Sequence, residues 1–349
     1  MFYPFKFVPV FKDYIWGGRS LERFGKQLPK GKVAESWELS CHPDGLSVVQ
    51  NGIFQGRTLQ ALVEEFGTQI TGNCPDESFP LLVKLIDANE KLSVQVHPND
   101  AYAYQHEGER GKNEMWYILD AKPGARIIFD MKPGVTRQGF EKAVREDRVE
   151  DCLQAVPVQA GDYINIPAGV VHAIGEGIVL AEIQQNSNST YRIFDYHRTD
   201  KNGNSRPLHL EKAMDVIRFD SENRRKFSNG LLYEIAPKCS STVLVANHHF
   251  CVELLRITGE IKLNTRNRQF HILVCTEGSG TVTWEHGSIR FVLGETLFIP
   301  SDMKEYALQG SFKALQAYVP DLETDIFQRF RQMGYPTEEI LEKISGLKE

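Results

Sequence analysis

A short stretch at residues 91–98, with the sequence KLSVQVHP, carries the side chains best suited to chemistry. In a β-strand, successive side chains point to opposite faces. This stretch would then turn its leucine and two valines toward a core and collect Lys91, Ser93, Gln95 and His97 on the other face. Two of these, Gln95 and His97, would aim at one point, as two metal ligands on one strand must. An edge strand with a polar face in water would show the same alternation, so the stretch alone leaves both interpretations open.

Two further segments favour a metal site. Lys112 and Glu114 stand just ahead of an apolar segment, and His172 follows a strand and a tight turn at residues 167–169. A histidine and a glutamate from separate strand ends, joined to a Gln-x-His pair, give a nitrogen and oxygen ligand set. Such a set suits a catalytic divalent metal with one position left open for water or substrate. Glutamine is an unusual zinc ligand, so the chemistry alone supports Gln95 least.

Short apolar segments separated by glycine and proline predict a mainly β protein. The segments predicted as strands are residues 92–97, 116–119, 126–129, 162–167, 178–184, 252–257, 271–275, 281–284 and 296–300. Many short strands of this kind are typical of a barrel or sandwich. Helical spacing of apolar residues predicts helices at residues 58–66, 136–155 and within 321–347.

An internal repeat predicts two related units. Residues 161–167 and 294–300 share the spacing Gly-x5-Pro between apolar strands, and Glu305 stands in the second copy where His172 stands in the first. We therefore expect an N-terminal catalytic domain with helical insertions at residues 1–230 and a second β domain at residues 231–320. A C-terminal helical extension would occupy residues 321–349. The polar stretch at residues 221–229 is the predicted linker.

The composition excludes several classes of protein. The chain has 349 residues, is 41% hydrophobic and 25% charged, and carries a net charge of −6, as ordinary globular proteins do. The basic residues form no cluster that would indicate nucleic-acid binding. Residues 1–17 do not resemble a signal peptide, and the uncharged stretch at residues 163–175 is too short to span a membrane. Six cysteines without a CxxC pair predict reduced thiols in a cytoplasmic protein.

Several motifs together carry a family resemblance. The spacing of residues 161–172 is similar to the second motif of the cupins, which are small β-barrels that hold one metal. LVKLIDANEKLSVQVHPND at residues 82–100, KNEMWY at 112–117 and QQNSNSTYRIFDYHR at 184–198 resemble type I mannose-6-phosphate isomerases. DYIWGG at residues 13–18 and AESWELS at 34–40 are similar to other signatures of that family. The resemblance runs from about residue 11 to residue 210 and implies two cupin-type, jelly-roll β-barrels with a few peripheral helices.

The resemblance also implies a set of site residues. It implies one zinc ion per chain, bound by Gln95, His97, Glu114 and His172. It implies catalytic roles for Arg192 and Lys112, and contacts with the substrate from Lys84, Ser93, Lys112 and Arg192. Lys91 has no firm counterpart in the family. Asn188 departs from it, because many relatives have an aspartate there, and this puts in doubt any mechanism that needs a carboxylate at that position.

The separation between Glu114 and His172 is too short for the helical domain that the longer family form inserts there. The chain therefore resembles the short bacterial form. In the second barrel Glu305 replaces His172, and a residue near Arg268 takes the place of Glu114. We expect that barrel to be metal-free and structural.

The family resemblance implies interconversion of mannose 6-phosphate and fructose 6-phosphate through a cis-enediol. The sequence does not single out the proton-transfer base. Lys112, with a pKa lowered by neighbouring cations, is one candidate, and Glu182 or Gln184 could relay a proton. Two alternatives remain: a metal-dependent cupin dioxygenase that uses His97, His172 and Glu114, and a sugar-phosphate-binding bicupin without catalysis. A small-molecule sugar phosphate is the expected partner, with no nucleic acid or membrane, and the protein would be a monomer or weak homo-oligomer.

Overall fold

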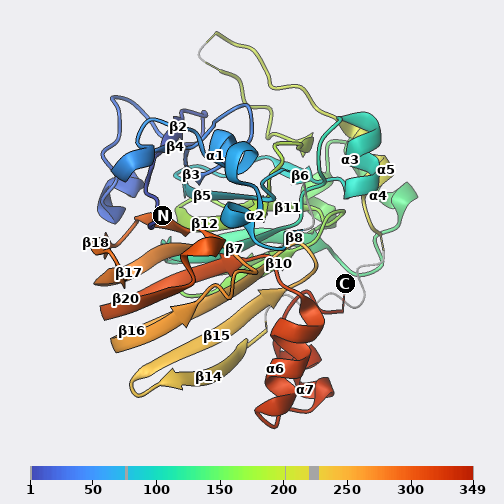
Figure 1. Ribbon diagram of the computed structural model, residues 1–349. Coiled ribbons are helices and arrows are strands. Elements are labelled where there is room, and N and C mark those ends of the chain that lie inside the picture. Colours follow the sequence, from blue (N-terminus) through green and yellow to red (C-terminus); the bar gives the residue numbers. More distant parts are fainter. Residues whose placement is uncertain (1, 75–77, 201, 220–227, 349) are drawn as a thin grey trace.

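Strands predominate in the structure, a computed structural model that describes residues 2–74, 78–200, 202–219 and 228–348 (Figure 1). Three large antiparallel sheets account for most of them, and a small pair joins β1 (Phe7–Val8) to β4 (Val48–Val49). The predicted mainly β fold class is confirmed. Within the described residues, no helix is long and apolar enough to cross a membrane. Residues 221–227 of the predicted linker lie outside the described residues.

A six-stranded sheet forms the centre of the N-terminal half, in the order β10-β7-β12-β5-β3-β2. Its strands are β2 (Val10–Lys12), β3 (Glu35–Leu39), β5 (Leu81–Ala88), β7 (Glu114–Ala121), β10 (Tyr163–Ile166) and β12 (Ile178–Gln185). Both faces are covered, and β12 shows how. Its residues Val179, Ala181 and Ile183 pack in one apolar core, and Ile178 and Leu180 pack in another. The strand is therefore apolar on both faces until Glu182 interrupts the second one.

A five-stranded sheet packs against the face of the six-stranded sheet that carries Glu182. Its order is β13-β6-β11-β8-β9, and its strands are β6 (Val94–Val96), β8 (Arg126–Met131), β9 (Leu153–Pro157), β11 (His172–Ile174) and β13 (Tyr191–Phe194). The core between the two sheets joins Trp116 and Ile118 to Ile127 and Phe129. On β6 the two valines pack in a separate core outside this sandwich. Gln95, between them, consequently points into it.

The C-terminal half forms a third sheet, in the order β14-β15-β16-β20-β17-β18, with β19 also paired to β17. The strands are β14 (Leu231–Ala236), β15 (Cys239–Ala246), β16 (Cys251–Asn264), β17 (His271–Trp284), β18 (Gly287–Val292), β19 (Thr296–Ile299) and β20 (Glu305–Tyr318). Two of the predicted strands, at residues 271–275 and 281–284, are parts of the single long strand β17. The largest core lies between this sheet and the six-stranded sheet, where Val83 and Ile183 meet Val252 and Ala317.

Helices cover the outer surfaces. They are α1 (Leu59–Phe66), α2 (Thr68–Thr71), α3 (Asp100–His106), α4 (Arg137–Arg145), α5 (Leu210–Val216), α6 (Arg329–Gln332) and α7 (Thr337–Lys343). Short 3-10 turns occur at η1 (Ser20–Phe24), η2 (Gly52–Phe54), η3 (Val149–Cys152) and η5 (Ser301–Met303), and η6 (Leu322–Gln328) is a π-helix. As predicted for residues 58–66, α1 begins after Thr58, whose hydroxyl caps the helix by accepting from the Ala61 N–H.

The helix predicted over residues 136–155 is wrong beyond Arg145. Asp147 adopts a φ of 56°, which a right-handed helix cannot continue through. The chain then makes the turn η3 and enters the edge strand β9. The apolar side chain of Leu153, which looked like part of a helical stripe, packs as a strand residue in the core outside the five-stranded sheet.

The C-terminal helices lie against the third sheet, where Ile326, Phe330 and Ile340 pack on Leu231 and Val243 (Figure 1). A buried polar group also ties them down. One Glu253 oxygen lies 2.9 Å from Arg329 Nη1 and 2.8 Å from the Tyr318 hydroxyl. The other accepts from the Ser241 and Tyr233 hydroxyls. Burial raises the pKa of Glu253, but Arg329 and these hydroxyls outweigh it and lower that pKa to about 2.

Replacing Arg329 with methionine should lower the free energy of unfolding at pH 7 by about 3 kcal/mol, because it leaves a charged carboxylate buried without its cation. Urea denaturation measures this loss. The carboxylate stabilises the fold above its unfolded pKa of 4.5, and this contribution is lost as the pH falls toward 2. The difference between wild type and variant should therefore shrink over that range. Arg331→Met is the control, since Arg331 pairs with Glu323 in an exposed position, and it should cost less than about 1 kcal/mol. An equal loss in both variants would contradict the role of Glu253.

Candidate active site

Three residues that could bind a metal meet between the two N-terminal sheets. His97 directly follows β6, Glu114 begins β7, and His172 begins β11. Their candidate ligand atoms all lie within 4.8 Å of one another. The Nε2 atoms of His97 and His172 are 3.1 Å apart, and they lie 3.4 Å and 3.2 Å from the two oxygens of Glu114. All three side chains are buried.

Both histidines present an unprotonated nitrogen to this cluster. His97 Nδ1 lies 2.9 Å from the Ser189 carbonyl oxygen, and His172 Nδ1 lies 2.8 Å from that of Val170. A carbonyl can only accept, so each Nδ1 must donate, and in the neutral ring Nε2 keeps its lone pair. Burial, followed by nearby Lys112, lowers the pKa of His97 to about 4, and burial lowers that of His172. Both rings are therefore neutral near pH 7, as metal ligands must be.

Glu114 completes the cluster with negative charge. Neither of its oxygens has a well-aligned hydrogen-bond partner within the described residues, although Lys112 Nζ lies 2.6 Å from Oε2. Burial raises the pKa of Glu114, but the positive charge of Lys112 is the first of the contributions that outweigh it and hold that pKa well below 4.5. A buried carboxylate with unused lone pairs beside two neutral imidazoles fits a divalent cation.

Gln95 reaches the same cluster. It is paired with His172 across the β6–β11 ladder, and its Nε2 lies 3.3 Å from His172 Nε2. The two ends of an amide are interchangeable by a flip of the side chain, which would turn Oε1 toward the cluster. Thus Gln95, which the sequence analysis placed in the ligand set, adjoins the other three residues of that set, and its oxygen is available as a fourth ligand.

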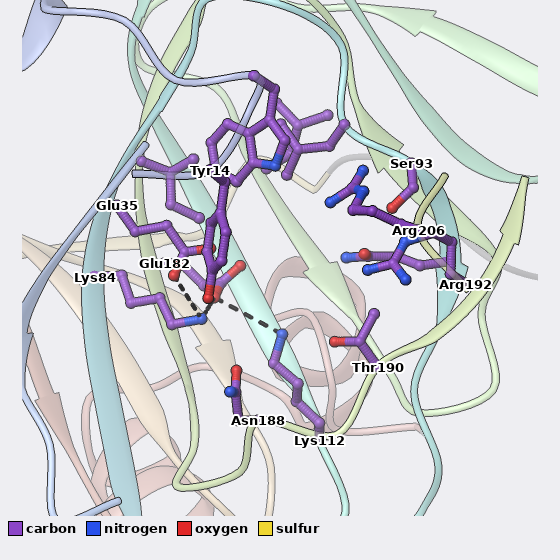
Figure 2. Close-up of a pocket in the computed structure, with 15 residues that line it drawn as sticks. Tyr14, Glu35, Lys84, Ser93, Lys112, Glu182, Asn188, Thr190, Arg192 and Arg206 are labelled. Carbon is purple, nitrogen blue, oxygen red and sulfur yellow. Dashed lines mark ion pairs between the residues drawn. The ribbon is translucent and has the colours of Figure 1, made fainter. Parts of the chain in front are cut away.

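A pocket of about 240 Å³ opens beside the cluster (Figure 2). It is lined by Tyr14, Trp16, Glu35, Lys84, Ile86, Leu92, Ser93, Gln95, Lys112, Ile174, Glu182, Asn188, Thr190, Arg192 and Arg206. Gln95 and Lys112 both line the pocket, and they also contact His172 and Glu114 of the candidate metal site. A molecule in the pocket would therefore lie next to a bound metal.

One wall of the pocket is a buried chain of alternating charges. Lys84 Nζ lies 3.5 Å from Glu35 and 3.3 Å from Glu182 Oε1. That oxygen is 3.8 Å from Lys112 Nζ and has no hydrogen-bond partner within the described residues. Burial lowers the pKa of Lys84, but Glu35 and Glu182 outweigh it and raise that pKa above 10.5. Lys84 is therefore a fixed cation rather than a base.

The opposite side of the pocket gathers guanidinium groups, with Arg192, Arg206 and Ser93 close together in Figure 2. Arg206 Nε and Nη2 donate to the two oxygens of the Asp195 carboxylate, at 2.8 Å and 2.6 Å. Arg192 donates to the Pro207 carbonyl, while its buried Nε has no partner within the described chain. Burial and the nearby Arg206 lower the pKa of Arg192. Two cations held this close favour an anion between them.

Asn188 also lines the pocket, where many relatives of the resembled family have an aspartate. Its amide donates to Asp44 at 2.7 Å. A carboxylate is thus present next to this position, but Asp44 is half-exposed and does not itself line the pocket.

The pocket and the His97–Glu114–His172 cluster beside it bring together most of the residues singled out from the sequence, but Lys91 and Gln184 lie in neither. Ser93, Lys84, Lys112, Arg192 and Glu182 line the pocket. Lys91 instead lies over the ring of Tyr196 near Glu150. Gln184 donates to the carbonyls of Gln185 and Ser187.

Sequence reasoning missed, as individuals, five lining residues that carry a polar side-chain atom: Tyr14, Trp16, Glu35, Thr190 and Arg206. The first three lie in the segments at residues 13–18 and 34–40, and Thr190 lies in the segment at 184–198. The motifs therefore gave a signal for these four. Arg206 lies outside the quoted motifs, in a segment without regular secondary structure, and no pattern points to it.

Comparisons with known proteins agree with this geometry. Residues 4–125 match the family description "Phosphomannose isomerase type I, catalytic domain", and residues 240–319 match "Mannose-6-phosphate isomerase, cupin domain". The chain is 37% identical over 317 residues to mannose-6-phosphate isomerase ManA of Bacillus subtilis, a match that covers 90% of this chain and 99% of that protein. This chain belongs to the type I phosphomannose isomerase family.

Other members of the type I phosphomannose isomerase family are similar over nearly the whole chain. Mannose-6-phosphate isomerase of Streptococcus mutans is 35% identical over 306 residues, covering 87% of this chain and 94% of that one. The crystal structure of mannose 6-phosphate isomerase from Bacillus subtilis superposes with a TM-score of 0.84 at 33% identity, covering 90% of this chain and 99% of that one. The predicted family and its cupin fold are thus confirmed.

Proposed function

We propose that this protein is a zinc-dependent isomerase that interconverts mannose 6-phosphate and fructose 6-phosphate through a cis-enediol. The observation that carries the proposal is the placement of the pocket. It has a metal-binding cluster beside it and the guanidinium groups of Arg192 and Arg206 on one side. A sugar phosphate has the matching chemistry, with oxygens for a metal at one end and a dianion at the other.

The metal would be held by His97, Glu114 and His172, with the Gln95 oxygen as the fourth ligand. The donor set is nitrogen and oxygen, which suits zinc as well as iron. Zinc is favoured because an aldose–ketose isomerisation exchanges no electrons with an external acceptor. When bound, it supplies Lewis-acid stabilisation of negative charge on sugar oxygens.

The cations of the pocket position the substrate. Arg192 and Arg206 would bind the phosphate, with the Ser93 hydroxyl donating a further hydrogen bond. Charge-assisted hydrogen bonds from guanidinium groups fix an anion in both distance and direction. On the other side, Lys84 stays charged between Glu35 and Glu182 and can donate to a sugar hydroxyl. Holding both ends of the sugar places C1 and C2 near Lys112.

The reaction needs one proton taken from C2 and one given to C1. Removal of the C2 proton leaves an electron pair that forms the C1=C2 bond, while the carbonyl electrons move to O1 and a proton binds there. The cis-enediol then loses its O2 proton, forms the C2 carbonyl and gains a proton at C1. Lys112 Nζ and Glu182 Oε1 lie 3.8 Å apart in the pocket, and we propose this pair as the group that carries protons between these atoms. Arg192 would stabilise the charge that develops.

The organisation of the chain is part of the proposal. We assign catalysis to a domain at residues 1–230, with a second cupin domain at 231–320 and a helical extension at 321–349. Before residue 200 and after residue 230, the large sheets share no strands, which supports this division. A cytoplasmic location fits the six cysteines, which form no disulfide bond within the described residues. We propose one zinc ion per chain, in a monomer or weak homo-oligomer.

A coupled assay for fructose 6-phosphate formed from mannose 6-phosphate tests the function. Turnover should disappear when the metal is removed with a chelator and should return when zinc is added back. The same protein should consume no oxygen, which separates the isomerase from a cupin dioxygenase. Folded, zinc-loaded protein that binds mannose 6-phosphate without converting it would sink the proposal in favour of a sugar-phosphate-binding bicupin.

A further inference from the structure

The third sheet repeats the six-stranded sheet strand for strand. The order β10-β7-β12-β5-β3-β2 in the first corresponds to β19-β17-β20-β16-β15-β14 in the second. The register agrees as well. Trp116 pairs with Glu182 and Glu182 with Lys84, just as Leu273 pairs with Gln316 and Gln316 with Glu253. Even the register shift on β3, between Trp37 and Leu39, recurs on β15 between Val243 and Val245.

This register assigns four residues of the first site a counterpart in the second barrel. The Gly-x5-Pro repeat aligns Ile166 with Ile299. Glu114 pairs with the first of these and His271 with the second. His271 is therefore the counterpart of Glu114, and the expectation that a residue near Arg268 takes that place is wrong. The full set of counterparts is Ser241 for Glu35, Glu253 for Lys84, Gln316 for Glu182 and His271 for Glu114.

A second cavity lies at these positions, with a volume of about 290 Å³. It is bounded by the sheet residues Glu253, His271 and Gln316, by the β16–β17 connection, and by Arg329 from the C-terminal helices. Its size is close to that of the pocket in the first barrel. All four counterpart positions are polar and buried, although an ordinary barrel core would be apolar there.

Two polar groups in the wall are left for a ligand. Gln316 is 6% exposed, and its amide makes no hydrogen bond within the described residues. His271 is 5% exposed and uses Nδ1 to contact the Tyr306 hydroxyl at 2.8 Å, which leaves Nε2 without a partner in the described part of the chain. Burial lowers the pKa of His271 to about 4, so the ring is neutral near pH 7. A buried amide without a partner is costly unless something in the cavity satisfies it.

The charge of the cavity is positive at its mouth. The two carboxylates in the wall are already engaged: Glu253 binds Arg329 and three hydroxyls, and Asp325 lies 3.6 Å from Arg268 and accepts from Gln269. Lys262 and Arg266 also line the cavity, and both are exposed. Neither forms an ion pair within the described residues. An anion entering the mouth would meet two unpaired cations.

We propose that this cavity is a second ligand site, which binds a small polyhydroxylated anion of the sugar-phosphate class. The phosphate would bind Lys262 and Arg266 at the mouth, and hydroxyls of the sugar would bind Gln316 and His271 inside. The inference is carried by the second cavity itself and stands independently of the proposed isomerase activity. Gln316 stands in this site where Glu182 stands in the first, so the site holds its ligand without the carboxylate proposed for proton transfer.

Equilibrium dialysis of the full-length protein against radiolabelled fructose 6-phosphate tests the proposal, because it counts bound sugar phosphate whether or not the label is isomerised. Two ligands should bind per chain. Gln316→Leu and Arg266→Ser should each weaken one of the two sites by about tenfold or more, the scale of one lost hydrogen bond or charge contact. Gln316→Leu removes a buried unpaired amide, so the protein should remain folded and its melting temperature should not fall.

The control variants carry the same two substitutions, glutamine to leucine and arginine to serine, at positions outside the second cavity. Gln309→Leu lies on the same strand, and Arg290→Ser lies on β18; both side chains are exposed outside the cavity. Both should leave two sites. Arg192→Ala should weaken only the site in the first barrel. The number of ligands bound per chain therefore distinguishes failure of the isomerase proposal from failure of this one. If the wild-type protein binds one ligand per chain and Gln316→Leu binds it equally well, the proposal of a second site is wrong. Displacement of the second label by inorganic phosphate as effectively as by sorbitol 6-phosphate would overturn its recognition of the sugar.

Discussion

Replacing His172 with glutamine should lower the affinity for zinc more than about 100-fold, since a lost ligand costs at least as much as a lost neighbour of a ligand. Isomerase activity at a fixed zinc concentration should fall with it. His172 Nε2 faces Glu114 and His97 at 3.2 Å and 3.1 Å, and Nδ1 is fixed by the Val170 carbonyl. Glutamine cannot place a neutral nitrogen lone pair at that point. Zinc content after dialysis against a weak chelator, together with the coupled assay, measures both effects.

His271→Gln is the matched control for this experiment. His271 is also buried, and burial lowers its pKa as it lowers that of His172, but it lies in the second barrel, away from Glu114. That variant should keep its zinc and its isomerase activity. If His172→Gln retains zinc as tightly as wild type, the assignment of the cluster as the metal site is wrong. If both variants lose zinc, the loss reports general instability.

Replacing Arg206 with methionine should raise the KM for mannose 6-phosphate by about 10- to 100-fold, the worth of one charge-assisted hydrogen bond to phosphate. The effect on kcat should be smaller, because the phosphate binds alike in the ground state and the transition state. Arg192→Lys should also raise KM, since an ammonium keeps the charge but loses the planar two-point contact. Steady-state kinetics over a range of mannose 6-phosphate concentrations separates these constants.

Arg198→Met provides the comparison for Arg206. Both arginines bind Asp195, so either variant leaves that carboxylate with one guanidinium partner. Arg206 lines the pocket and Arg198 does not. Arg198→Met should therefore change KM by less than about threefold, because Arg198 makes no contact with the pocket and the change removes no contact to the phosphate. An equal rise in both variants would mean that Asp195 shapes the site indirectly, and an unchanged KM in Arg206→Met would remove Arg206 from phosphate recognition.

The local pattern of the chain was enough to single out the residues that could bind a metal, and the motifs of the resembled family added much of the pocket. The alternation in residues 91–98 separates Gln95 and His97 from the valines that pack in the core, because a strand exposes a face every second residue. The same alternation also placed Lys91 on the face of Gln95 and His97, but Lys91 does not line the pocket. Its side chain leaves the pocket for Tyr196 because the regular strand begins only at Val94. Where regular structure stops, the period of two no longer predicts direction.

Helical spacing failed for a related reason at residues 136–155. Three apolar residues at suitable intervals looked like one stripe, but the φ of Asp147 ends the helix and Leu153 continues in a strand. The spacing of apolar residues shows which side chains will be buried, but it does not show which part of the protein they will pack against. The packing partners that decide between helix and strand are distant in sequence.

The sequence by itself therefore determined the strand-rich fold and the His97–Glu114–His172 set with Lys112 beside it, since these follow from residue type and short-range spacing. The cations Lys84 and Arg192 came from the motifs that resemble the family. Only the tertiary structure decided that Arg206 joins Arg192, that Glu182 stands between two lysines, and that His271 occupies the register position of Glu114. The physical reason is that each of these depends on hydrogen-bond register between strands, or, for Arg206, on the ion pair with Asp195 that holds an irregular segment against the pocket. Contacts of this kind leave no repeating pattern in the sequence from which they could be predicted.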